Sequence, residues 1–144
     1  MSRPMSVDER IAFLSHGTRT GKLATVREDG RPHVQPIWFV LDEDDGSLVF
    51  TTGRATVKGR NLRRDPRASL IVDDEAPPFA YVRVDGAVEI SEDLDEMLVW
   101  ATRIAYRYMG PELAESYGRR NAVPGELLVR LRPAHVVTEA GVAD

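Results

Sequence analysis

The segment Ser47–Asp74, "SLVFTTGRATVKGRNLRRDPRASLIVDD", contains the pattern that decides the fold. Its two ends, "SLVFTT" and "ASLIVDD", are typical of strands. Between them, Thr56 has the position of a helix N-cap, and Pro66 predicts where the short helix must have ended. This connection is strongly basic, with six of the chain's 19 lysine and arginine residues, although the whole chain has a net charge of -4.

The basic helix is a candidate anion site. A helix N-terminus presents free N–H groups and partial positive charge, so phosphate binds there readily. Lys58 could contact such a phosphate as a point charge, and Arg54 and Arg60 would add forked donors. From the residues alone, a solvated surface helix is an equally good interpretation. Nucleic acid is a weaker alternative, because six charges on an acidic protein make a small footprint.

The remaining pattern predicts one domain, residues 1–144, built as an antiparallel barrel with peripheral helices. Asp29-Gly30 is a strong hairpin signal, and Pro36 belongs at a strand edge or bulge. The expected helices are a first one capped by Ser6, a long one capped by Ser91 and a short one over 111–120. The expected strands are 21–27, 31–42 (with 37–41 buried on both faces), 47–52, 68–74, 79–90, 126–133 and 135–140, the last as a seventh strand or a continuation of the sixth.

Several functional classes have little support. The chain has no cysteine, and its three histidines (His16, His33 and His135) are too far apart in sequence for a metal motif, so we expect no metal. No nucleophile motif is present, and no catalytic residue can be assigned. We find no signal peptide or apolar run long enough to span a bilayer. We therefore expect a cytoplasmic protein that binds neither membrane nor nucleic acid.

The order of motifs resembles the pyridoxamine 5'-phosphate oxidase-like FMN-binding split β-barrel superfamily. The resemblance covers 21–90 most strongly, through "RPHVQPIWFV", "LVFTTGRATVKGRNLRRDPRASLIV" and "YVRVDGAVEI". Within the superfamily the sequence is most similar to the branch of oxidoreductases that use the deazaflavin coenzyme F420. The resemblance implies a mainly β fold, a six-stranded antiparallel split β-barrel (Greek key) with peripheral helices, and a homodimer with cofactors between the subunits.

The resemblance also implies a set of cofactor-binding residues. Two aromatic residues at the start of the fifth strand, Phe79 and Tyr81, are candidates to close the site, from the same subunit or from its partner. The cofactor phosphate would be held at the end of the third strand and the following loop, and the ring by the second strand. The residues expected to bind the phosphate are Thr51, Thr52, Thr56 and Lys58, with Arg54, Arg60 and Asn61 nearby. The residues expected to line the ring are Gln35, Pro36, Ile37 and Trp38.

Two departures from pyridoxamine phosphate oxidase weigh against vitamin B6 oxidation. Many FMN binders have an arginine where this chain has Val57, and the chain's sole Arg-x-His is Arg31-Pro32-His33, far from the C-terminus. The surplus of arginines, including Arg63 and Arg64, favours F420 over FMN because F420 carries an acidic oligoglutamate tail.

The resulting prediction is an F420-dependent oxidoreductase that transfers hydride between the deazaflavin and a small unsaturated organic substrate. An FMN-binding oxidoreductase is the alternative. A non-catalytic carrier of F420, FMN or a tetrapyrrole remains open as a different class, since a hydride-transfer enzyme needs free space above the ring.

Overall fold

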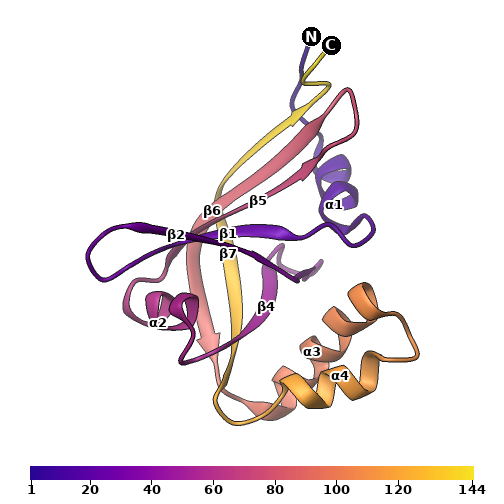
Figure 1. Ribbon diagram of the computed structural model, residues 1–144. Helices are drawn as coiled ribbons and strands as arrows, with labels where there is room; N and C mark the ends of the chain where they lie inside the picture. The colour runs from indigo at the N-terminus through magenta and orange to yellow at the C-terminus, as the bar shows by residue number, and fades with distance from the viewer.

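The computed structural model describes all 144 residues as one curled antiparallel sheet with four helices (Figure 1). The strand order in the seven-stranded sheet is β2-β1-β5-β6-β7-β4-β3. The helices are α1 (Val7–Ser15), α2 (Val57–Arg64), α3 (Leu94–Met109) and α4 (Ala114–Asn121). The strands are β1 (Gly21–Val26), β2 (Pro32–Ile37), β3 (Val40–Leu41), β4 (Leu48–Gly53), β5 (Arg67–Asp74), β6 (Ala80–Ser91) and β7 (Glu126–Ala140).

The main core fills the concave side of the sheet. It comprises 16 buried residues, and its largest fully buried members include Phe39, Phe50 and Leu70. Helix α2 connects β4 to β5 and contacts both β1 and β4, so it closes one side of the half-barrel (Figure 1). Leu62 of α2 is only 2% exposed because it is inserted into this core.

A second, smaller core lies under α3, on the other face of β4 and β7. Val49 and Leu128 pack there against Met97 and Trp100 of the helix. Successive side chains of a strand point to opposite faces, so Leu48 and Phe50 enter the main core while Val49 enters the second. Strand β4 is therefore buried on both faces, which fixes the position of its C-terminal end, where the phosphate site is expected.

The predicted second strand, 31–42, is wrong in its continuity. Strand β2 ends at Ile37, and β3 begins at Val40 on the far edge of the sheet. Trp38 is 40% exposed, so the expected burial of 37–41 on both faces is not found. This interruption raises the number of strands from the expected six to seven. Pro36 does lie on an edge strand, where its missing N–H is tolerated.

The helix caps agree with the sequence pattern at α1 but not at α3, and α4 begins at Ala114, three residues after the predicted start at Pro111. The Ser6 side chain accepts a hydrogen bond from the Glu9 N–H, as predicted for the cap of α1. Helix α3 is capped by Asp93, not Ser91, because Ser91 is still paired in β6 and the Asp93 carboxylate accepts from two N–H groups of the first turn. Strand β7 is continuous over both expected C-terminal strands, and it pairs with β6 over residues 128–140 and with β4 over residues 126–131.

Candidate cofactor site

The N-terminus of α2 is built around the hydroxyl of Thr56. Thr56 Oγ1 accepts from the Gly59 N–H at 3.0 Å and donates to Gly53 O at 2.8 Å. Thr52 Oγ1 lies 3.0 Å from Thr56 Oγ1. A hydroxyl carries one proton, so Thr56 must accept from Thr52 when it donates to Gly53. The cap predicted at Thr56 is confirmed, and buried Thr52 supports it.

Helix α2 approaches the end of β4 too closely for any side chain at Gly59. A Cβ added to Gly59 would overlap the carbonyl oxygen of Gly53 and lie 3.0 Å from Thr56 Oγ1. Glycine at this position therefore allows the first turn of the helix to rest directly on the strand end. The contact holds the helix N-terminus at a fixed place relative to β4.

Three donors at this N-terminus are available to a ligand. The N–H groups of Val57 and Lys58 have no acceptor within the chain, as expected for the first turn of a helix. The Lys58 ammonium contacts Gln35 Oε1 at 3.5 Å and makes no ion pair within 4.0 Å. Burial lowers the pKa of Lys58, and the nearby Glu126 opposes that shift. This combination of free N–H groups and an unpaired cation suits a phosphate.

Most of the expected residues meet at one cleft of about 330 Å³ beside this N-terminus. The strand end provides Thr51, Thr52 and Gly53, and the helix provides Thr56 and Lys58. Strand β2 and the break after it provide Pro36, Ile37 and Trp38, and Gln35 contacts Lys58. The cleft thus has a polar end suited to phosphate and an apolar wall suited to a flat ring.

The Trp38 side chain forms the exposed part of that wall, and α3 holds it in place. Its ring stacks on Tyr108 with centroids 5.0 Å apart and planes 3° from parallel. The Tyr108 hydroxyl accepts a hydrogen bond from the Phe39 N–H and donates one to Arg19 O. The Arg107 guanidinium donates to the carbonyl oxygens of Phe39, Leu14 and Gly17. Side chains of α3 therefore satisfy the backbone where β2 breaks.

Four lining residues were missed by the sequence analysis. They are Gly53 at the end of β4, Ile104 of α3, Asn121 at the end of α4, and Glu126 at the start of β7. Burial raises the pKa of Glu126, and Lys58 partly opposes the rise. No local motif marks Glu126, because β-sheet pairing brings it opposite Gly53 from a distant part of the chain.

Arg60 and Asn61 face away from this cleft. They line a second cleft of about 660 Å³, between α2 and the β1–β2 hairpin, together with Arg27, Arg31 and Arg64. Asn61 is 4% exposed and donates to Thr25 Oγ1 at 3.0 Å, so its side chain joins α2 to β1. Residues three and four apart share a helix face, which explains why 57, 60, 61 and 64 occur together here.

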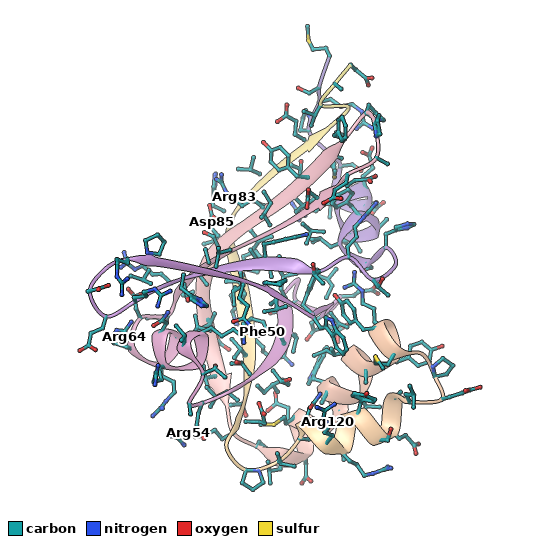
Figure 2. The ribbon with its side chains drawn as sticks, viewed as in Figure 1. Phe50, Arg54, Arg64, Arg83, Asp85 and Arg120 are labelled. Carbon is teal, nitrogen blue, oxygen red and sulfur yellow. The ribbon has the colours of Figure 1, made fainter.

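Arg54, Phe79 and Tyr81 also lie outside the first cleft within this chain. Arg54 forms an ion pair with Glu92 at 2.8 Å, and it lies at the opposite end of the α2 segment from Arg64 (Figure 2). Phe79 lines a pocket near the two chain termini, and Tyr81 donates to Glu139. A contribution of Phe79 or Tyr81 to a partner subunit's site stays a prediction.

Comparison with known proteins identifies the family. The family model described as pyridoxamine 5'-phosphate oxidase matches residues 7–138. The chain belongs to the pyridoxamine 5'-phosphate oxidase family. The suspected superfamily and its fold are therefore confirmed.

Relatives within the pyridoxamine 5'-phosphate oxidase family include enzymes with different named activities. An F420H(2)-dependent biliverdin reductase of Mycobacterium tuberculosis is 31% identical over 105 residues, which are 72% of this chain and 73% of that protein. A 5a,11a-dehydrotetracycline/5a,11a-dehydrooxytetracycline reductase of Streptomyces rimosus is 40% identical over 57 residues, 38% of this chain. That match spans only 39% of the reductase. A pyridoxine/pyridoxamine 5'-phosphate oxidase of Bordetella pertussis is 34% identical over 57% of this chain, and the match spans 38% of the oxidase.

Solved structures show the same fold as this family member. The crystal structure of the conserved hypothetical protein Rv2991 from Mycobacterium tuberculosis matches with a TM-score of 0.83 and 27% identity, and the match covers 95% of this chain and 86% of that one. No helix in the present chain has the length and apolar character required to cross a bilayer. No three or more His, Asp or Glu side chains come together as a metal site.

Proposed function

We propose that the chain binds the deazaflavin coenzyme F420 and catalyses hydride transfer between it and a small unsaturated organic molecule. The observation that carries this proposal is the convergence of Lys58 and two free N–H groups at the α2 N-terminus, in one cleft with the apolar wall at Trp38. The similarity to an F420H(2)-dependent reductase over 72% of the chain supports the choice of cofactor.

The residues of the cleft fit the common part of F420 and FMN. Lys58 and the N–H groups of Val57 and Lys58 would hold the phosphate, with the Thr51 hydroxyl free to add a donor. Pro36, Ile37 and Trp38 would pack against the ring. The bound deazaflavin supplies or accepts the hydride, while the protein orients the ring and excludes water from it.

The acidic tail of F420 has a different set of candidate partners from those at the phosphate. Arg27 and Arg60 line the second cleft without a carboxylate partner, whereas Arg31 is paired with Asp29. We therefore propose that carboxylates of the tail pass over α2 toward Arg27 and Arg60. Arg54 and Arg64 are less suitable because Glu92 and the Val26 carbonyl already engage them.

FMN is the second candidate cofactor, because the chain is 34% identical over 82 residues to a pyridoxine/pyridoxamine 5'-phosphate oxidase. Both cofactors have a phosphate for Lys58, and they differ in the tail. Titration of the purified protein with each cofactor, followed by fluorescence, separates the two. Submicromolar F420 binding with much weaker FMN binding is expected, and the reverse order would exclude the F420 proposal.

The phosphate site itself is tested by Lys58→Ala. Loss of a charge-assisted contact should weaken binding of either cofactor by about 1–3 kcal/mol, or roughly 5- to 150-fold. Lys22→Ala is a matched control, because Lys22 pairs with Asp73 at 3.2 Å in a different part of the sheet. Equal affinities for the Lys58→Ala and Lys22→Ala variants would show that the phosphate binds elsewhere.

Turnover separates an enzyme from a carrier. Reduced F420 bound to the protein should be oxidised when conjugated enones or related unsaturated acceptors are added, with a rise in the absorbance of the oxidised deazaflavin. Binding of F420 without oxidation by any acceptor in a broad panel would favour the carrier.

A further inference from the structure

The carboxylate of Glu126 lies beside the proposed phosphate site. Glu126 is the first residue of β7 and pairs in register with Gly53, the last residue of β4. A Cβ placed on Gly53 would lie 4.0 Å from Glu126 Oε1 and 3.3 Å from the methyl group of Thr56. The Glu126 carboxylate and the Thr56 methyl group therefore both flank Gly53, in the same cleft as Lys58.

The charges around this N-terminus are few. Helix α2 has no acidic residue in its first turn, and the Arg54 guanidinium is bound to Glu92. Lys58 from α2 and Glu126 from β7 are thus the charged groups that line the cleft. His33 of the neighbouring β2 is close enough for Lys58 to lower its pKa, although burial is the larger cause. The net charge of the two lining groups is zero when both are ionised.

We infer that Glu126 shifts the preference of the site away from a doubly charged phosphomonoester and toward a singly charged phosphodiester. This inference rests on the proposed function, in which Lys58 and the α2 N-terminus hold the cofactor phosphate. A phosphomonoester such as that of FMN carries about 1.5 to 2 negative charges at pH 7. The phosphate of F420 is esterified on both sides and carries one, so it is repelled less by Glu126.

The effect of Glu126 scales with the charge of the ligand. One unit charge about 6 Å away, at a dielectric constant close to that of water, changes binding about threefold per ligand charge. Glu126→Gln should therefore strengthen binding of a monoanion about threefold and of a dianion about tenfold. The ratio of the monoanion affinity to the dianion affinity separates this effect of the Glu126 charge from a general change in the site, which would alter both affinities equally.

The experiment compares FMN with its phosphate methyl ester, riboflavin 5'-methylphosphate. These probes share one ring and one ribityl chain and differ in phosphate charge. At pH 8, Glu126→Gln should raise the affinity for FMN relative to the affinity for the ester about threefold. Glu126→Asp keeps the charge and should keep the wild-type preference. Calorimetric or fluorescence titration measures all of these affinities without turnover.

Glu112→Gln is the matched control, because it changes net charge equally at an exposed residue between α3 and α4. An unchanged ratio of the FMN and ester affinities in Glu126→Gln would overturn the inference, as would an equal shift of this ratio in Glu112→Gln. Lys58→Ala distinguishes this failure from failure of the proposed function. If Lys58→Ala weakens both probes while Glu126→Gln leaves the ratio unchanged, only the role of Glu126 is wrong. If Lys58→Ala affects neither probe, the phosphate site is wrong as well.

Discussion

Glu126 is a half-buried carboxylate beside the proposed phosphate site. Burial raises the pKa of Glu126 above its usual value, and Lys58 offsets part of this rise. The folded state then binds the Glu126 proton more tightly than the unfolded state does. The free energy of unfolding should accordingly fall as pH rises from the unfolded pKa, about 4.3, through the higher folded pKa.

Glu126→Gln removes this titration and should be more stable than the wild-type protein at pH 7. The gain should largely disappear near pH 4, where Glu126 is mostly protonated in both states. Urea denaturation of the cofactor-free protein at pH 4 and pH 7 measures the difference, with Glu112→Gln as the reference. A Glu126→Gln variant less stable than the wild type at pH 7 would mean that attraction to Lys58 outweighs the cost of burial.

At the scale of single elements, α2 contacts the core, strand β1 and the proposed phosphate site. Its Leu62 enters the core, its Asn61 binds β1, and its first turn rests on the carbonyl of Gly53. The helix also separates two clefts, with Lys58 on one side and Arg60 on the other. A displacement of α2 should therefore affect the core, the hairpin contact and the phosphate site together.

Gly59→Ala tests this close contact. In an ordinary helix interior the change would stabilise the protein by about 0.5–1 kcal/mol. Here the new Cβ would overlap Gly53 O, so we expect a destabilisation of about 1–3 kcal/mol, as for overpacking, together with weaker cofactor binding. Arg63→Ala on the exposed side of α2 is the control and should remain within about 0.5 kcal/mol of the wild type. Stabilisation by Gly59→Ala in urea denaturation would contradict the contact.

At the scale of the whole molecule, the cofactor cleft of one chain is an incomplete enclosure. Trp38 is 40% exposed at its wall, and Phe79 and Tyr81, the aromatic residues expected to close it, lie elsewhere in the same chain. The resemblance to split-barrel proteins implies a second subunit that covers the site. In such a dimer the substrate would lie between the exposed ring of the cofactor and the partner subunit.

We therefore predict a homodimer with about twice the 16.1 kDa mass of the chain. Size-exclusion chromatography with light scattering measures the mass, and the cofactor titration gives the stoichiometry of one cofactor per chain. A monomer that binds cofactor with unchanged affinity on dilution would show that one chain suffices for the site.

The sequence by itself determined the order of strands around the basic helix, the cap at Thr56 and the position of Lys58. These features depend on alternation along strands, on turn residues and on caps, which act over a few neighbouring residues. The family resemblance also identified Pro36, Ile37 and Trp38 as lining candidates, and the structure brings all three to the cleft with Lys58.

Tertiary structure decided the features that depend on contacts between distant segments. The strand break at Trp38 and Phe39 is stabilised by Arg107 and Tyr108 of α3, about 70 residues later in the chain. The Arg60 and Asn61 side chains point toward the second cleft because their face of α2 packs against the β1–β2 hairpin. Glu126 enters the cleft only because the β4–β7 register sets it opposite Gly53. No local pattern contains these contacts, because they arise when the curled sheet and its packed helices bring distant backbone and side chains together.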